Sequence, residues 1–303
     1  MKPRQPRLVS VVAPVHNNAA QLPRLVAEVA ASLQPNKVEI VLVDDGSSDD
    51  SWAIIRKEKA KNRGRLSVRG IRLSRNFGQH RAICAGLQAA QGDFVFVLDA
   101  DLQDDPAYMP EMLALALSGH EVVHARRRAR IFNPRHLVSQ LVYLVVTKVS
   151  EIPWHPGMGN YKILSRKALL AALKFQTYHP LLELMVAQAG FRPGFLDVRR
   201  RTRPGTASAY GFFASLRFVF GLLVNYSTLF FRAMLITGLI VATAVPLLLL
   251  VFAGPEQIER IIAGCAALAS GTLLMASGIL GYYIRNLQVS SRQWPIFVID
   301  ETI

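Results

Sequence analysis

Four acidic residues crowd into seven positions after a short apolar run, and their type and spacing are suited to binding a cation. They are Asp99, Asp101, Asp104 and Asp105. Their mutual repulsion calls for a bound cation or for raised pKa values. One or two such carboxylates, together with a substrate diphosphate, commonly hold Mg²⁺ or Mn²⁺, and the ion neutralises the leaving diphosphate. The cluster therefore predicts a divalent-metal site, although Asp104 and Asp105 are also placed to cap a helix that begins at Pro106.

A second acidic pair, Asp44 and Asp45, stands where the apolar run Val38–Val43 ends, and Gly46 follows it. A carboxylate at the end of a buried strand can accept hydrogen bonds from the base or ribose of a nucleotide. The serines after the glycine are suited to capping the next helix. Capping explains the serines and one acid, whereas two adjacent acids favour a binding role.

Strand-like and helix-like patterns alternate through the first part of the chain and would position both acidic groups. Strands are expected at residues 8–15, 38–43, 66–73, 93–98 and 121–125, and helices at 20–33, 48–61, 77–90 and 106–117. Repeated strand–helix–strand units predict an α/β fold with a mostly parallel, Rossmann-like sheet covered by helices on both faces. Ligands of such sheets bind beyond the carboxyl ends of the strands, where both acidic groups lie.

The last part of the chain is typical of membrane segments. Ala233 to Ala253 is a run of 21 residues without a charge, and Ile261 to Ile284 is a second run of 24 residues. Each is long enough to cross a hydrocarbon core of about 30 Å as a helix, and a buried helical hairpin is the alternative. Two acids and one base lie in the loop between them, whereas arginines flank both runs on the outside. By the positive-inside rule, both outer ends are expected to be cytoplasmic.

Residues 210–231 are also apolar, but their small and polar residues recur every three or four positions. This pattern favours an amphipathic helix in the membrane interface, with a third span as the alternative. The predicted organisation is a head of residues 1–205, an interfacial region of residues 206–231, and a membrane region of residues 232–303. The membrane region contains two transmembrane helices, at about 233–253 and 261–284, and a C-terminal tail.

The composition agrees with a soluble head joined to a membrane region. The 303 residues are 51% hydrophobic, yet the formal net charge is +14. A strongly basic chain suggests nucleic acid or the anionic face of a membrane as a partner, and the apolar tail together with the lack of a recognition motif favours the lipid bilayer over nucleic acid. The two cysteines, Cys84 and Cys265, exclude a disulfide framework and favour a cytosolic head. The short N-terminal apolar run, broken by Pro14, predicts no signal peptide.

Several motifs in order along the chain resemble those of the family-2 glycosyltransferases with a GT-A fold. They resemble in particular the polyprenyl-phosphate glycosyltransferases, which include dolichyl-phosphate mannose synthase and bacterial undecaprenyl-phosphate sugar transferases. The motifs are residues 10–17 (Ser-Val-Val-Ala-Pro-Val-His-Asn), 43–51, 73–79 (Leu-Ser-Arg-Asn-Phe-Gly-Gln), 92–106 and the two apolar C-terminal runs. The resemblance implies a GT-A head, a nucleotide-sugar donor such as a UDP-sugar, a polyprenyl phosphate acceptor, Mg²⁺ or Mn²⁺, and a homo-oligomer such as a tetramer.

The resemblance also implies site residues. Those of the nucleotide-sugar pocket would be Pro14, His16, Asn18, Asp44, Asp45, Asp99 and Ala100. Asp99 and Asp101 would form the metal-binding Asp-x-Asp element with Gln103 beside them, and Asp104 would complete the catalytic group as an assisting base. The residues that bind the acceptor phosphate would be Arg127, Arg135 and Ser139. Arginine offers phosphate a matching fork of donors, but the basic run around Arg127 is also suited to facing anionic lipid.

Three positions depart from the family's pattern. Asn18 stands where the family commonly has Glu, and Asn160 replaces the Asp of a Gly-Asp-Phe-Arg element, which here is Gly-Asn-Tyr-Lys. A Gly-x-Ser-x-Tyr element is stretched over residues 205–210. These changes bear on the choice of sugar and on the geometry of the acceptor more than on the metal site.

The expected function is inverting transfer of a sugar from a nucleotide-sugar to a polyprenyl phosphate. The expected place is the cytoplasmic face of the bacterial inner membrane, with the head and both termini in the cytoplasm. A phosphate monoester is mostly a dianion at neutral pH and needs no strong base to attack the sugar. The alternatives are a catalytically decayed membrane scaffold and a glycosyltransferase with a different lipid or glycan acceptor. A processive polysaccharide synthase is disfavoured because the Gln-x-x-Arg-Trp element of those enzymes is absent.

Overall fold

The computed structural model describes residues 6–62, 64–127, 159–175, 180–199, 201, 258–291 and 295–303, with short helical stretches at 232, 235–240, 243–244, 247 and 251. The chain divides into two compact units. One comprises residues 1–134, 153–207 and 295–303, and the other comprises residues 135–152 and 208–294. The first unit holds a β-sheet with its helices, and the second holds a long apolar helix.

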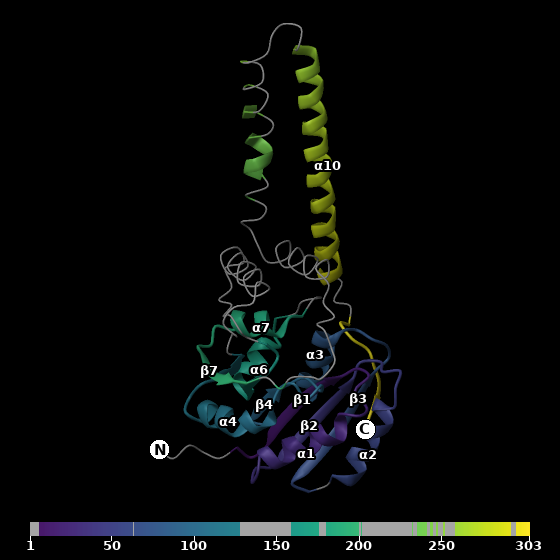
Figure 1. The fold of residues 1–303 in the computed structure, drawn as a ribbon, viewed down its shortest axis with the longest axis vertical. Helices are drawn as coiled ribbons and strands as arrows, with labels where there is room; N and C mark the ends of the chain where they lie inside the picture. Colours follow the sequence, from purple (N-terminus) through teal and green to yellow (C-terminus); the bar gives the residue numbers. More distant parts are fainter. Residues whose placement is uncertain are drawn as a thin grey trace. The chain divides into compact units, whose positions relative to one another are not determined.

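An eight-stranded sheet forms the centre of the first unit, with its strands in the order β7-β5-β6-β4-β1-β2-β3-β8 (Figure 1). The strands are β1 (Val9–Val15), β2 (Val38–Asp44), β3 (Leu66–Leu73), β4 (Phe94–Val97), β5 (Val122–Arg127), β6 (Lys162–Ser165), β7 (Pro193–Val198) and β8 (Ile299–Thr302). Parallel pairing joins β4, β1, β2 and β3 and joins β5 to β7, whereas β6 and β8 are antiparallel to their neighbours. The four adjacent parallel strands therefore end at one edge of a mixed sheet.

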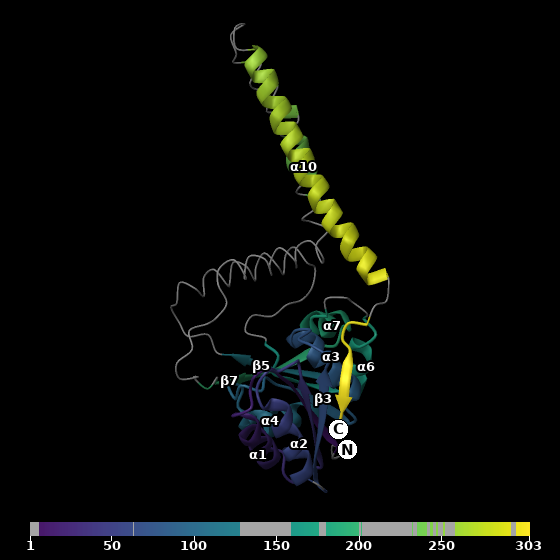
Figure 2. The same cartoon turned by 90° about the vertical axis from the view of Figure 1, so that its right-hand side faces the viewer.

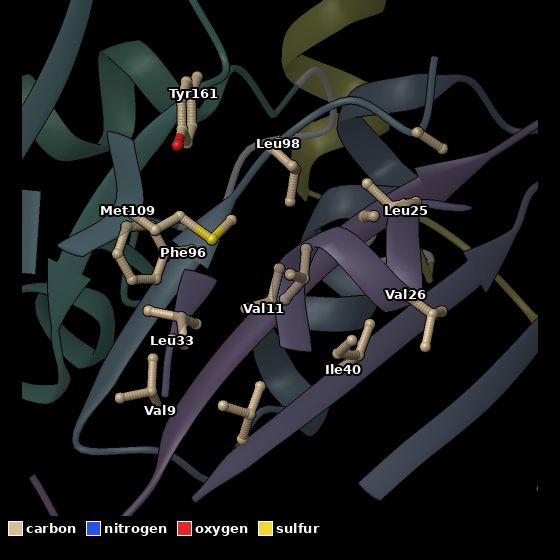
Figure 3. Close-up of a cluster of buried hydrophobic side chains, with 14 of the residues drawn as sticks. Val9, Val11, Leu25, Val26, Leu33, Ile40, Phe96, Leu98, Met109 and Tyr161 are labelled. Atoms are coloured by element: carbon tan, nitrogen blue, oxygen red, sulfur yellow. The ribbon is translucent and has the colours of Figure 1, made fainter. Parts of the chain in front are cut away.

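Helices cover both faces of this sheet. They are α1 (Leu22–Ser32), α2 (Ser51–Lys61), α3 (Gln79–Ala89), α4 (Met109–Leu117), α6 (Arg166–Ala172) and α7 (Leu182–Gln188), with a short 3₁₀ helix, η1 (Pro106–Tyr108). Successive strand residues point to opposite faces, and Val11 and Val12 accordingly belong to different cores. The core around Val11 includes Leu25 and Phe96 and packs α1, α2 and α4 (Figure 3), whereas the core around Val12 packs α3, α6 and α7. Coverage of both faces explains why every residue of β1 and β2 is buried.

The predicted α/β fold, with helices on both faces of a sheet, is confirmed. The five predicted strands correspond to β1–β5, and the four predicted helices correspond to α1–α4. The sequence does not predict β6, β7 and β8, of which β6 and β8 make the sheet mixed rather than parallel.

The second unit contains α10 (Ile258–Ser291). Within it, Ile262–Arg285 is long and apolar enough to cross a membrane, judged by length and composition, and none of it is buried by the rest of the structure. This segment coincides closely with the predicted span at 261–284. Of the other predicted span, at 233–253, the described residues are helical, and the remainder lies outside the described part of the chain. The predicted interfacial region of residues 206–231 also lies outside it.

The strand β8 belongs to the sheet of the first unit although α10 precedes it in the chain (Figure 2). Gly70 of β3 donates to the carbonyl of Ile303 at 3.0 Å, and Ile303 donates back at 2.8 Å. Glu301 accepts a hydrogen bond from the indole of Trp52 at 3.1 Å. Residues 295–303, which the sequence groups with the membrane region, therefore belong to the first unit, and residues 299–302 lie in its sheet.

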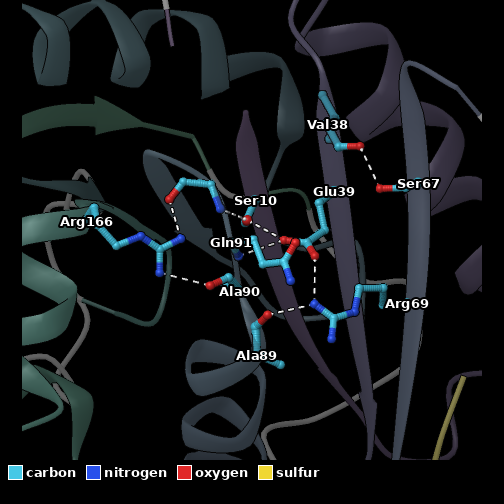
Figure 4. A network of polar contacts seen from close by, with 10 residues as sticks. Ser10, Val38, Glu39, Ser67, Arg69, Ala89, Ala90, Gln91 and Arg166 are labelled. Carbon is cyan, nitrogen blue, oxygen red and sulfur yellow. Dashed lines mark hydrogen bonds and ion pairs between the residues drawn. The ribbon is translucent and has the colours of Figure 1, made fainter. Parts of the chain in front are cut away.

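Buried polar groups form a network near the amino-terminal ends of the parallel strands (Figure 4). Glu39 of β2, only 3% exposed, accepts hydrogen bonds from Ser10 of β1 at 2.6 Å, Arg69 of β3 at 3.0 Å and the backbone N–H of Gln91 at 2.9 Å. Arg69 also donates to the carbonyl of Ala89, at the end of α3, at 2.8 Å. A buried carboxylate requires such partners because its desolvation is costly. The network therefore ties three strands together at the end opposite the acidic motifs.

A buried ion pair links β6 to α7. Lys162 Nζ, with its side chain 0% exposed, lies 2.7 Å from the carboxylate of Glu183, whose side chain is 11% exposed. Burial by itself raises the pKa of the Glu183 carboxyl, but the charges of Lys162 and His80 outweigh burial and lower this pKa to about 2. Burial also lowers the pKa of His80, which lies in α3 within the electrostatic influence of both partners. The pair therefore connects β6 to α7, and its charges act on His80 of α3.

We expect the substitution Lys162→Met to lower the free energy of unfolding by about 3 to 5 kcal/mol, because it leaves the Glu183 carboxylate buried without its partner. The double variant Lys162→Met/Glu183→Leu should be far less affected, since a buried pair can be replaced by apolar side chains at little cost. Thermal unfolding in detergent checks both expectations, and a single variant as stable as the wild type would contradict them. The pKa of Glu183 lies below its ordinary value of 4.5, so the stabilisation is present above about pH 4.5 and is lost as the pH falls toward 2. The wild type should therefore lose stability relative to the double variant over that range.

Candidate active site

The buried carboxylate of Asp45 joins the loops that follow β2 and β3. The residue is 3% exposed, and its side chain accepts hydrogen bonds from the backbone N–H groups of Phe77 at 2.7 Å and Gly78 at 2.9 Å. Gly46 permits the two loops to approach, because a Cβ atom at this position would lie 2.6 Å from the backbone nitrogen of Asn76. Its φ of +66° is also one that glycine adopts readily. The sequence Asp-Asp-Gly therefore allows the loop after β2 to pack closely against the loop after β3.

His16 lies at the same edge of the sheet, one residue beyond β1. Its ring nitrogens are 3.1 Å from the carbonyl oxygen of Asp45 and 3.3 Å from the side-chain amide of Asn76. Asn18 accepts a hydrogen bond from the backbone N–H of His16 at 3.3 Å, and its own backbone N–H donates to the hydroxyl of Ser51 at 3.1 Å. The structure therefore brings together three residues predicted to line a nucleotide pocket.

Three further residues predicted to line the pocket, Pro14, Asp44 and Ala100, are buried. Pro14 lies within β1, in register with Val43 of β2. Asp44 ends β2, is 1% exposed and accepts a hydrogen bond from the backbone N–H of Ser47 at 3.2 Å. Ala100 is 3% exposed and lies between Asp99 and Asp101 in the chain. These three residues contribute to the framework of the strand ends.

Asp99 and Asp101 follow β4, and both carboxylates accept hydrogen bonds from side-chain amides. Asp99 Oδ1 accepts from Gln79 Nε2 at 2.5 Å and from Asn160 Nδ2 at 3.1 Å. Asp101 accepts from the backbone N–H of Gln103 at 3.1 Å and also from the side-chain amide of Gln103. The predicted proximity of Gln103 to the Asp-x-Asp element is therefore present in the structure.

The chemistry of these donors fits a divalent cation that is shared with a substrate. Asp99 and Asp101 are half-buried carboxylates two positions apart, and Mg²⁺ is commonly held by one or two carboxylates plus substrate phosphates. Within the described ranges, no group of three or more His, Cys, Asp or Glu side chains could hold a metal ion. A cation at this element would therefore depend on phosphate oxygens for part of its ligand set.

Asp104 and Asp105 have different surroundings. Asp104 is 5% exposed. The pKa of Tyr161 is raised, first by burial and then by the charges of Asp104 and Asp105. Asp105 accepts a hydrogen bond from the backbone N–H of Ala107 at 2.9 Å and pairs with Arg201 at 2.7 Å. The capping interpretation is therefore confirmed for Asp105, which begins η1.

The predicted acceptor residues are described only in part. Arg127 is the last residue of β5, in register with Val198 of β7, and its side chain lies outside the described part of the structure. Its neighbour Arg126 forms an ion pair with Asp197 at 2.7 Å. Arg135 and Ser139 also lie outside the described residues. Their convergence on an acceptor phosphate therefore remains a prediction.

The sequence does not predict the two amides that contact Asp99. Gln79 lies 20 positions before Asp99, and Asn160 lies 61 positions after it. In the sequence, Gln79 is only the last residue of a motif, and Asn160 is only a departure from a family pattern. Only the folded structure shows that both amides lie beside the ends of β3 and β4.

A sheet of this order, with acidic residues at the carboxyl ends of its parallel strands, is the GT-A fold of glycosyltransferases. The glucosyl-3-phosphoglycerate synthase of Mycobacterium tuberculosis, in complex with Mn²⁺, UDP-glucose and phosphoglyceric acid, is similar with a TM-score of 0.52 and 18% identity, over 73% of this chain and 79% of that chain. The mannosyl-3-phosphoglycerate synthase of Rubrobacter xylanophilus is similar with a TM-score of 0.51 and 18% identity, over 71% of each chain. These likenesses define the fold class.

The chain belongs to glycosyltransferase family 2, since the family described as "Glycosyl transferase family 2" matches residues 10–177. An undecaprenyl-phosphate 4-deoxy-4-formamido-L-arabinose transferase of Aeromonas hydrophila is 31% identical over 316 residues, covering 98% of this chain and 94% of the relative. A Pseudomonas aeruginosa protein of the same name is 32% identical over 320 residues, covering 100% of this chain and 92% of the relative. The similarity thus extends beyond the head, and the predicted family is confirmed.

We expect Asp45→Ala to lower the free energy of unfolding by about 1.5 to 3 kcal/mol, because two partly buried backbone N–H groups would lose a charged acceptor. Asp50→Ala is the matched control, since Asp50 is exposed and makes no capping hydrogen bond. That control should change the stability by less than about 0.5 kcal/mol. Thermal unfolding of both variants checks the expectation, and equal stabilities would show that Asp45 does not hold the loops.

Proposed function

We propose that this chain transfers a sugar from a UDP-sugar to undecaprenyl phosphate or a related polyprenyl phosphate, giving a polyprenyl-phosphate-linked sugar. The observation that carries the proposal is similarity over almost the whole chain to relatives named undecaprenyl-phosphate sugar transferases. The half-buried aspartates after β4 support it, because they offer the ligand set that a metal-bound diphosphate requires. The UDP-glucose in the related synthase of the same fold supports a uridine donor.

The donor would bind across the carboxyl ends of β1, β2 and β4. His16, Asn18 and Asp45 lie together there, with Asp44 and Pro14 in the framework beneath, and would hold the base and ribose. Asp99 and Asp101 would hold Mg²⁺ or Mn²⁺, which when bound neutralises the charge of the leaving diphosphate. The Mn²⁺ in the related synthase supports this assignment.

Reaction of the acceptor would depend on positive charge around its phosphate and on the position of that phosphate more than on a general base. A phosphate monoester is mostly dianionic at neutral pH, so it can attack the anomeric carbon once it is held in line. Arg127, Arg135 and Ser139 are our candidates for holding that phosphate, because arginine offers it a planar fork of donors. A single displacement of this kind inverts the anomeric carbon, and Asp104 is our candidate for an assisting base.

We also propose that the protein is an integral protein of the bacterial inner membrane with its head and C-terminal strand in the cytoplasm. Pairing of β8 with β3 supports this topology, because both strands must lie on the same side of the membrane. The chain between β3 and β8 must then cross the membrane an even number of times. If α10 crosses once, a second span is required, for which residues 233–253 are the candidate. The candidate spans of residues 233–253 and 261–284, an interfacial region of residues 206–231 and a head of residues 1–205 completed by β8 agree with this arrangement.

We expect the purified protein to convert undecaprenyl phosphate to a glycosylated lipid with one donor from a panel of UDP-sugars that includes UDP-4-deoxy-4-formamido-L-arabinose. Mass spectrometry of the lipid identifies the sugar. Asp99→Ala and Asp101→Ala should lower turnover roughly 100-fold or more, and excess EDTA should act similarly. The control Glu111→Ala changes an exposed residue of α4 and should retain activity. Absence of any lipid product would reject the acceptor, and full turnover in EDTA would reject the metal.

We expect an engineered cysteine at Val298, beside β8, to be labelled from the same side of the membrane as one at Lys57 of the head, because both residues are exposed in the first unit. A cysteine at Glu256, between the two candidate spans, should be labelled from the opposite side. Labelling is done in spheroplasts and in inverted vesicles, with Cys84 and Cys265 replaced by Ser. Opposite labelling of the Val298 and Lys57 positions would contradict the even number of crossings.

A further inference from the structure

One oxygen of Asp99 is bound by two neutral amides that come from different parts of the fold. Gln79 is the first residue of α3, and its amide nitrogen lies 2.5 Å from Asp99 Oδ1. Asn160 lies two positions before β6, and its amide nitrogen lies 3.1 Å from the same oxygen. Two such bonds restrict the orientation of this half-buried carboxylate. We call Gln79 and Asn160 the amide clamp.

The identity of Asn160 matters because of its distance to Asp99. An acid at this position would bring a second carboxylate oxygen to about 3.1 Å from Asp99 Oδ1. Two carboxylates so close repel each other unless a proton or a cation lies between them. The amide instead donates a hydrogen bond and adds no negative charge beside Asp99.

The two residues of the amide clamp adjoin elements that share one buried core. Gln79 precedes His80, which lies within the electrostatic influence of Lys162 and Glu183. Asn160 lies two residues before Lys162, which pairs with Glu183 of α7 at 2.7 Å. Residues of α3, β6 and α7 pack in one buried core, and the ion pair also joins β6 to α7, so both amides reach Asp99 from rigid supports.

We propose that Asn160 and Gln79 are positioning residues that hold Asp99 ready for a metal, and that the amide at Asn160 keeps the affinity for the free ion low. The metal would then enter together with the diphosphate of the donor rather than before it. This inference rests on the metal-dependent transfer proposed above. It follows from ligand counting, since two carboxylates leave most positions of a Mg²⁺ or Mn²⁺ ion to be filled by phosphate oxygens and water.

The contact itself is tested without metal or substrate, by thermal unfolding in EDTA. Asn160→Asp should lower Tm by about 3 to 6 °C, because it sets two carboxylates against each other. The reciprocal double variant Asp99→Asn/Asn160→Asp should recover most of that loss, since it exchanges donor and acceptor. No recovery in the double variant, or no loss in the single one, would overturn the amide clamp.

Asn62→Asp is the matched control. The amide of Asn62 donates to the carboxylate of Glu58 at 3.2 Å, which is the same kind of contact at the end of α2. This variant should also lose stability, but it should leave metal binding unchanged. It therefore separates a general effect of an added acid from an effect on the site.

The consequence for the metal is tested by electron paramagnetic resonance of Mn²⁺, with and without UDP. Wild-type protein should bind Mn²⁺ weakly alone and at least tenfold more tightly with UDP, whereas Asn160→Asp should bind free Mn²⁺ at least tenfold more tightly than the wild type. Asn160→Ala should bind Mn²⁺ with UDP about tenfold more weakly, which corresponds to about 1.4 kcal/mol. Equal affinities for free Mn²⁺ in the wild type and Asn160→Asp would overturn the proposal.

Failure of this proposal is distinguishable from failure of the proposed function. The wild-type enzyme could glycosylate the lipid but bind Mn²⁺ equally well with and without UDP. This result would overturn the proposal that metal and diphosphate bind together, and it would not contradict the transfer reaction. The opposite outcome is a protein that makes no lipid product, although Tm recovers in the double variant and Asn160→Asp binds Mn²⁺ more tightly. That outcome would support the amide clamp and reject only the proposed reaction.

Discussion

The carboxyl edge of the sheet depends on one buried carboxylate, that of Asp45. Its backbone N–H donates to the carbonyl of Val15 at 2.8 Å, and its side chain accepts two backbone N–H groups from the loop after β3. A buried anion held in this way cannot move without leaving these groups unpaired. The ends of three strands are consequently fixed by one residue, and His16 takes its position from the same loops.

The two ends of the parallel strands have different polar chemistry. At the amino-terminal end, Glu39 is enclosed and satisfied by Ser10, Arg69 and Gln91, so this end serves the stability of the sheet. At the carboxyl end, Asp44 and Asp45 are buried like Glu39, but Asp99 and Asp101 are only half-buried. Burial therefore separates the charges that hold the fold together from the charges that remain available to a ligand.

The sequence is informative where one local rule decides the structure. Apolar runs that end in acids predict β2 and β4 and place Asp45 and Asp99 at the ligand-binding edge, because parallel strands end together. The strand β6 is not predicted because it begins with Lys162, and a charged residue is not expected in a buried strand. Only the ion pair with Glu183, which the structure reveals, explains its burial. In the same way, β8 is short, carries two acids and follows a membrane-like helix, so only its pairing with β3 reveals it.

The late position of β8 in the chain also constrains biosynthesis. The ribosome produces β3 early and β8 only after α10, so the edge of β3 carries unpaired backbone groups throughout the intervening synthesis. Exposed strand edges of this kind are sites of aggregation. If the chain crosses the membrane as proposed, a nascent chain with an odd number of crossings would hold β8 on the far side of the bilayer, where it could not pair with β3. In the proposed topology, completion of the sheet would therefore depend on correct insertion, and a chain inserted wrongly would keep an open edge at β3.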